Sequence, residues 1–227
     1  MQAMINSPLF GLTLTLVAYV FATWLYQKTK FILFAPLITA VTLILVVLQL
    51  LAVPLETYRN GADIISLLLI PATASLAFSI YQQIKVLKAH LFPILLGTLV
   101  GSAVSVACIM ALAHLFQLPQ DLMVSLLPKS TTTAIAVELS EAHGGILGVT
   151  MAAVLVTGVF GAMFAPLWIR IFRIHNRVAA GVAIGASSHG LGTAKALEIG
   201  ELEGAMSGLA MGITGFFTVV VFLLALM

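Results

Sequence analysis

The sequence predicts an all-α polytopic membrane protein with about six full spans and two interrupted, re-entrant half-helix elements. Of its 227 residues, 61% are hydrophobic and only 8% are charged, and the mean hydropathy is +1.17. A soluble domain carries roughly 25% charged residues, so this chain cannot cover its surface for water. Apolar stretches also recur at about the 20-residue length that a helix needs to cross the hydrocarbon core.

Six stretches have the length and composition of full spans. The first has no basic residue before it, and Lys28 and Lys30 follow it, so we expect a retained span and not a signal peptide. In chain order the predicted spans are Pro8–Gln27, Phe31–Val53, Ala62–Gln82, His90–Phe116, Ile146–Ile169 and Gly204–Met227. Two further stretches, about 120–145 and 178–199, are only partly apolar and contain helix-loosening Gly or Pro. They are either two extra spans or two re-entrant elements.

The distribution of charge favours re-entrant elements. Cytoplasmic loops collect Lys and Arg, and the basic clusters here are Lys28/Lys30, Lys85/Lys88 and Arg170/Arg173/Arg177. All three lie on the inner side only if 120–145 enters and leaves from the outer side. By the same reasoning 178–199 enters and leaves from the inner side, so the two elements approach the midplane from opposite faces.

A faint internal repeat suggests the domain organisation. Sliding the chain by 57 residues aligns Gly101, Gly158 and Gly215, and also Ser130 with Ser187. We expect an N-terminal two-span region at 1–60 and a core at 61–227. The core would consist of three units at about 61–118, 119–177 and 178–227, each an interrupted element plus a long span. The last two units would be inverted repeats, a pointer to the binding site of a secondary transporter. Chance identity among Gly and Ala is the alternative.

The first interruption reads LLPKSTTTAIAVELSEAHGG at 126–145. Pro128 favours a helix that begins just after it. The hydroxyls that crowd this start suit N-capping. They belong to Ser130, Thr131, Thr132 and Thr133. We expect the helix to run to about Ser140 and to end at the His143-Gly144-Gly145 run, where glycine serves as a C-cap.

The second interruption reads GVAIGASSHGLGTAKALE at 181–198. Gly181 and Gly185 loosen a first half-helix. Ser187, Ser188 and His189 form the break. Gly190 and Gly192 allow close backbone approach, and the helix resumes from Thr193 to Glu198. A broken helix in lipid occurs only where it faces protein or a wet cavity.

Both interruptions predict an anion site. The amino end of a helix carries free N–H donors and about half a positive charge. Two such ends that meet at mid-membrane would cradle a small carboxylate. Lys129 would supply charge, Ser and Thr would orient the anion, and His189 would be a donor or a proton carrier. The candidate substrate-binding residues are Lys129, Ser130, Thr131, Thr132, Ser187, Ser188, His189, Gly190 and Thr193.

Structural interpretations of the same residues stay open. Ser and Thr also pack transmembrane helices together, Lys129 can snorkel outward, and His189 can cap its own helix. Cys108 is interpreted as a small apolar filler. No metal-ligand motif or cofactor motif is present, and the net charge of +2 is too small to suggest nucleic acid. The GASSH run lacks the final glycine and the strand–turn–helix context of a nucleophile elbow, so we do not expect an enzyme.

Three motifs carry a family resemblance: PATASLAFSIYQQ at 71–83, PKSTTTAIA at 128–136 and GASSHGLGTAKALE at 185–198. With them in this order, the chain resembles the LrgB/CidB family of bacterial inner-membrane proteins, YohK-type members included, over essentially its whole length. The motif match carries Lys129, Ser130, Thr131, Thr132, Ser188, His189 and Thr193 over as functional positions. Ala134 stands where a family proline is expected, which puts the bend after Thr133 in doubt.

The resemblance implies a multi-pass inner-membrane protein that acts with a small, separately encoded LrgA/CidA-type membrane protein, and we also expect a homo-oligomer in the bilayer. The first hypothesis is a secondary transporter of small monocarboxylates such as glycolate, glycerate or pyruvate, with possible coupling to protons. The alternative is a holin- or antiholin-like regulator of murein hydrolase export and autolysis. The polar residues are bunched in two interruptions and not spread along one helix face, which favours the carrier.

Overall fold

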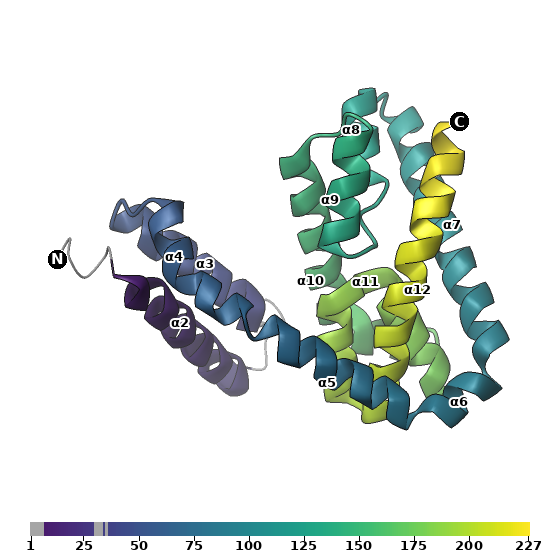
Figure 1. Ribbon diagram of the computed structural model, residues 1–227, viewed down its shortest axis with the longest axis horizontal. Helices are drawn as coiled ribbons and strands as arrows, with labels where there is room; N and C mark the ends of the chain where they lie inside the picture. The colour runs from purple at the N-terminus through teal and green to yellow at the C-terminus, as the bar shows by residue number, and fades with distance from the viewer. Residues whose placement is uncertain (1–6, 30–33, 35) are drawn as a thin grey trace. The chain divides into compact units, whose positions relative to one another are not determined.

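The computed structural model describes residues 7–29, 34 and 36–227, and the described chain is built from α-helices joined by short turns (Figure 1). The all-α prediction is confirmed. Two compact units divide the chain, one up to Ser75 and one from Leu76. In order, the helices are α2 (Pro8–Thr29), α3 (Pro36–Leu50), α4 (Leu55–Ser66), α5 (Leu69–Gln82), α6 (Ile84–Ala89), α7 (Leu91–Leu115), α8 (Gln120–Leu126), α9 (Thr133–Ala142), α10 (Leu147–Ile171), α11 (Arg177–Ile199) and α12 (Glu201–Leu226).

The N-terminal unit packs α2, α3 and α4 around small side chains. Ala18 and Ala22 of α2 are completely buried in one cluster with Ile44 of α3. Small side chains let apolar helices approach closely. The hydroxyls of Thr15 and Tyr58 form a hydrogen bond of 2.9 Å, which ties α4 to α2.

Two predicted spans differ from the structure. Phe31–Val53 corresponds to α3, which has 15 residues, and part of its predicted start lies outside the described residues. Ala62–Gln82 was wrong as a single span, because α4 ends and α5 begins around Leu67 and Leu68. Pro71 explains the break. It lacks the N–H that would bond to the carbonyl of Leu67, so the chain restarts a helix that has Pro71 in its first turn.

Four helices among the described residues are long and apolar enough to cross a membrane, fewer than the predicted six. They are Leu9–Thr29, Leu91–Leu115, Leu147–Ile171 and Glu201–Leu226. The last three form the frame of the C-terminal unit. Large apolar side chains project outward from them, among them Leu96, Leu112, Val156 and Leu224. Such an exterior suits a lipid solvent, as the composition predicts.

In the C-terminal unit α7 and α12 run side by side in the same direction (Figure 1). Ile94 and Met206, near their first turns, share one buried cluster, and Val106 and Phe222 share another further along. Helix α10 runs opposite to both. Its Ala165 shares a buried cluster with Ile184 of α11, whereas its Gly158 lies against His189, so α10 is antiparallel to this part of α11, which itself runs parallel to α12. An interrupted element can therefore enter at either end of this three-helix frame.

Candidate functional site

The second interrupted element, α11, turns sharply at His189, whose φ of 42° and ψ of −136° are not helical. Before this residue the chain packs closely on α12. A Cβ on Gly181 would meet the backbone of Glu203, and a Cβ on Gly185 would meet the backbone of Ser207. The residue numbers increase in the same direction in both helices, so the part of α11 before His189, its first limb, runs parallel to α12. The predicted break at Ser187–His189 is confirmed.

After His189 the chain runs back along α12. The Thr193 hydroxyl lies 2.9 Å from the Ser207 hydroxyl, and a Cβ on Gly204 would meet Leu197. These pairs run in opposite order, so the second limb is antiparallel to α12. The element enters and leaves at the same end of the unit, as predicted for a re-entrant element.

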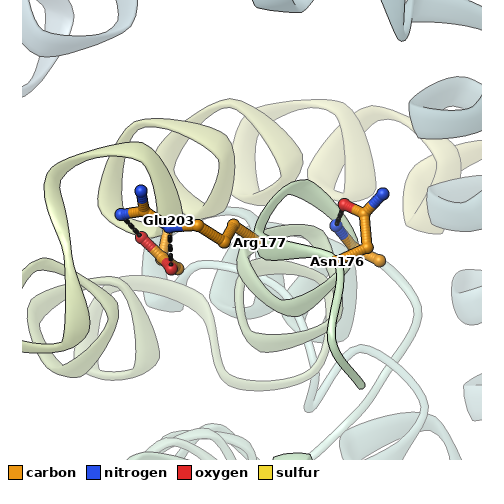
Figure 2. A network of polar contacts seen from close by, with 4 residues as sticks. Asn176, Arg177 and Glu203 are labelled. Carbon is orange, nitrogen blue, oxygen red and sulfur yellow. Dashed lines mark hydrogen bonds and ion pairs between the residues drawn. The ribbon is translucent and has the colours of Figure 1, made fainter.

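An ion pair closes the open end of this hairpin. Figure 2 shows Arg177, the first residue of α11, holding Glu203 of α12 with two hydrogen bonds of 2.7 Å, from Nε to Oε1 and from Nη2 to Oε2. Asn176 caps the same helix by accepting from the Ala179 N–H at 3.1 Å. The Glu203 side chain is only 8% exposed, so its charge depends on this bidentate partner.

The first interrupted element is α8, the segment 127–132 and α9. Helix α9 begins at Thr133 with Thr132 as N-cap residue, later than the predicted start just after Pro128. The cause is a turn in which the Thr131 N–H donates to the Pro128 carbonyl at 3.1 Å. Hydroxyl-rich residues favour such turns over helix.

The end of α9 is the predicted glycine C-cap. Gly144 has a φ of 78°, which favours glycine. The Gly145 N–H donates to the Ser140 carbonyl at 2.8 Å, as in a Schellman motif. The Ile146 N–H then donates to the Ser125 hydroxyl of α8 at 2.6 Å. The chain has therefore returned to α8, the helix by which it entered, so this element is re-entrant too.

The two elements enter from opposite ends of α12. Arg177 marks one entry beside Glu203, whereas His143, at the end of α9, packs its ring against Phe222 with 5.1 Å between centroids. Their tips converge in between. A Cβ on Gly215 would lie 3.3 Å from the Thr131 hydroxyl, and a Cβ on Gly190 would lie 4.0 Å from the Met211 sulfur. Residues 211 and 215 are only about 6 Å apart along a helix.

A cavity of about 920 Å³ opens between α7, α10, α11 and the first tip. Its polar wall combines the two tips, with Lys129 and Ser130 from one and Ser187 and Ser188 from the other. The rest is largely apolar, with Val100, Val104, Ala165, Trp168 and Ile169 among its lining residues. A concave, mostly apolar pocket with a few convergent polar groups is the usual form of a small-molecule site.

The first tip brings a cation to this wall. Lys129 is half-buried, and its ammonium donates to the Ser130 hydroxyl at 3.2 Å. Ser130 is in turn 2.9 Å from the hydroxyl of Ser105 on α7. The lysine thus has one hydroxyl partner here and two further N–H donors for an anion.

The second tip brings two neighbouring hydroxyls. Ser187 is exposed to the cavity, and its hydroxyl lies 2.9 Å from that of Ser188, which is buried. A Cβ on Gly161 of α10 would overlap the Ser188 side chain, so that glycine lets the tip seat against α10.

The other candidate residues are at the tips but do not line the cavity. Thr131 and Thr193 are buried, and Thr132 is half-buried. His189 faces α10, and its Nε2 donates to the Val154 carbonyl at 2.9 Å, which requires the proton on Nε2. Gly190 is exposed on the α12 side.

The family is decided by a scan against protein-family models. The LrgB-like family matches residues 15–227, nearly the whole chain. The chain belongs to the LrgB-like family. It is accordingly a multi-pass membrane protein of the LrgAB, holin-like type, from a family of membrane transporters or regulators that are generally paired with LrgA-type proteins. No solved structure matches it significantly.

Sequence reasoning missed several cavity residues of this LrgB-like protein. Ser105, Thr157 and Asn176 contribute polar lining from α7, α10 and the start of α11. Cys108, interpreted from the sequence as a small apolar filler, is exposed and lines the same cavity. Single hydroxyls and thiols inside apolar spans carry no signal of their own, since such residues are common at packed interfaces.

Proposed function

We propose that this LrgB-like protein is a secondary transporter of small monocarboxylates in the bacterial inner membrane. One observation carries the proposal: two re-entrant tips enter from opposite ends and share one cavity wall. Discontinuous helices that meet near the midplane are the usual construction of a substrate site in secondary transporters.

The wall suits a carboxylate with a single charge. Lys129 offers an ammonium, and Ser130, Ser187 and Ser188 offer hydroxyls that can donate to carboxylate oxygens. The amino end of α9 adds favourable potential, because Thr132 caps it without a side-chain hydrogen bond. Among the described lining residues Lys129 is the one Lys or Arg, which favours a monoanion over a dianion.

The expected repeat gives a route for alternating access. Gly158 and Gly215 occupy equivalent places in the two proposed inverted units, about 119–177 and 178–227. A Cβ on Gly158 would meet His189 of the other unit's tip, and a Cβ on Gly215 would meet Ile135 and approach Thr131 of the opposite tip. These reciprocal contacts support an inverted repeat. Rocking one unit against the other would then expose the wall to each side in turn.

The proposal also includes a partner protein and an oligomeric state. We expect a small LrgA/CidA-type membrane protein as partner and a homo-oligomer in the bilayer. The competing function is regulation of murein hydrolase export and autolysis by altered permeability. A carrier and a permeability regulator differ in what crosses the membrane, so transport measurements separate them.

The test is uptake of labelled glycolate, pyruvate and lactate into liposomes that contain the purified protein, with and without its small partner. Lys129→Ala removes the cavity cation and should lower uptake at least about tenfold, because a charge-assisted contact to a carboxylate is worth roughly 1.5–3 kcal/mol. Lys195→Ala is the matched control, since Lys195 pairs with Glu198 at 2.7 Å and does not line the cavity.

His189→Ala is the second variant, and it should lower uptake less than Lys129→Ala because His189 positions the tip from behind. Intact uptake in both variants would remove the site assignment. Leakage of an uncharged dye together with the acids, at the same rate in every variant, would favour the permeability regulator.

A further inference from the structure

A group of buried hydroxyls lies between α7 and α12 on the side of the first tip that does not line the cavity. The Ser102 hydroxyl is 3.4 Å from the Thr214 carbonyl oxygen and 3.4 Å from the Thr218 hydroxyl. These contacts are long for O–H···O hydrogen bonds, which are usually 2.5–3.0 Å. The single Ser102 proton has a better acceptor in the Thr98 carbonyl at 2.9 Å.

Two hydroxyls in this group have no hydrogen-bond partner among the described residues. They belong to Thr131 and Thr214, each only 1% exposed. The Thr131 hydroxyl lies 3.3 Å from the place of a Cβ on Gly215, the next residue after Thr214. Burying a hydroxyl without a partner costs roughly 1–3 kcal/mol on protein mutational data, and such groups call for an explanation.

A bound cation would explain both the unpaired oxygens and the long spacings. Cations of the size of Ca²⁺, which Na⁺ nearly matches, hold oxygens at about 2.3–2.6 Å, so neighbouring ligands lie roughly 3.3–3.7 Å apart. The observed separations of 3.4 Å match. All these oxygens are neutral, and no group of three His, Cys, Asp or Glu side chains occurs among the described residues. A divalent ion such as Ca²⁺ recruits carboxylates, so a monovalent ion fits better.

We propose that Ser102, Thr131, Thr214 and Thr218 bind one Na⁺ ion, through their hydroxyls and the Thr214 carbonyl. The sodium site does not require that the protein is a transporter. Its use as a coupling ion rests on the proposed carboxylate transport, and the geometry suits that use. Ser130 and Thr131 are consecutive, so the same tip presents one hydroxyl to the cavity and the next to the cation. An ion there would attract a carboxylate held beside Lys129.

The test is thermal unfolding of the purified full-length protein in nanodiscs, with NaCl, KCl or choline chloride at equal ionic strength. A ligand that binds only the folded state stabilises it in proportion to the logarithm of its concentration above saturation. We expect the apparent melting temperature to rise with Na⁺ and not with choline. Binding of radioactive sodium measures the affinity directly.

Variants make the result specific. Thr214→Val and Ser102→Ala each remove one ligand and should weaken sodium binding by about tenfold or more, as lost ligand-supporting groups do in metal sites. Thr39→Val is the matched control, because the Thr39 hydroxyl is another buried hydroxyl without a partner among the described residues, in the N-terminal unit. It should leave the Na⁺ effect intact.

Thr214→Val also separates a ligand from a merely unpaired group. If the hydroxyl is unpaired and binds nothing, valine should stabilise the protein equally in both salts. If it binds Na⁺, valine should reduce the increment that Na⁺ produces over choline. Equal melting temperatures of wild type in Na⁺ and choline would overturn the proposal.

Failure of the two proposals can be told apart. Sodium binding without uptake of any acid would retain this site and reject the carrier. Acid uptake into liposomes without sodium binding would retain the carrier and reject this site.

Discussion

The two re-entrant tips differ in how firmly the protein holds them. The second tip turns at His189 and is anchored by the hydrogen bond to Val154, by the Thr193–Ser207 hydroxyl pair and by the Arg177–Glu203 ion pair at its base. The first tip turns through segment 127–132. Its hydroxyls reach other elements through one described hydrogen bond, between Ser130 and Ser105.

The second tip is therefore the scaffold, and the first tip carries the charge. Every strong polar group of the second tip except its two serines is used to hold the tip in place. The first tip instead leaves the Lys129 ammonium facing the cavity and the Thr131 hydroxyl without a partner in the described chain. Substitutions at the anchoring residues of the second tip should therefore act on stability, whereas changes at Lys129 or Thr131 of the first tip should act on ligand binding.

The largest expected effect is at Gly185. A Cβ there would overlap the Ser207 carbonyl of α12, and backbone cannot move aside as a flexible side chain does. Gly185→Ala should destabilise the protein by about 3 kcal/mol, the upper part of the usual range for overpacking. Thermal unfolding measures it. Gly212→Ala is the control, because a Cβ on Gly212 meets nothing within 4 Å. Equal melting temperatures for both variants would show that α11 does not pack this closely.

The second effect is at the ion pair. Arg177→Ala leaves the Glu203 carboxylate buried without its bidentate partner, which destabilises more than the loss of an exposed pair. We expect a larger fall in melting temperature than for Lys195→Ala, which breaks the exposed Lys195–Glu198 pair. Adding Glu203→Gln to Arg177→Ala should recover part of the loss. No recovery would mean that Arg177 acts through packing alone.

A smaller effect is expected at His189, where two contributions can be separated. His189→Ala and His189→Gly both lose the hydrogen bond to Val154. Glycine tolerates the φ of 42°, so the His189→Gly variant should be more stable than the His189→Ala variant by about 1 kcal/mol.

His143 provides the reverse comparison. Its Nδ1 is 2.9 Å from the Leu139 carbonyl, but its φ is −119°. His143→Gly should therefore gain nothing over His143→Ala in thermal unfolding. The same ranking at both histidines would contradict the assignment of backbone strain to the second tip.

The smallest effect on stability is expected at Cys108, the single cysteine of the chain. It lines the same cavity as Lys129, so an anionic thiol reagent should react faster than a cationic one. Lys129→Ala should remove this preference, and a bound monocarboxylate should slow the reaction. The rate of labelling followed by mass spectrometry gives the result, with Cys108→Ser as the unlabelled control. Equal rates for both reagents would place the ammonium away from the cavity.

Composition and local pattern are enough to predict the membrane class, the two interruptions and their entry from opposite sides. Composition alone excludes a water-facing surface. Lys and Arg predict the inner loops, and glycine is favoured at the left-handed position that ends a helix, as at Gly144. Each of these properties depends on nearby residues or on a sum over the chain, so it can be predicted without knowledge of the tertiary structure. The same reasoning overestimated the spans, because Pro71 breaks Ala62–Gln82 into α4 and α5.

Which polar groups share a cavity depends on tertiary packing. Ser130 and Thr131 are neighbours in the chain, yet one lines the cavity and the other packs towards Gly215. Ser105 and Cys108 join the wall from α7, and His189 turns to α10. The direction of a side chain at a turn depends on the helices that surround it, and those helices come from distant parts of the chain. Residue type and spacing carry no information about that packing.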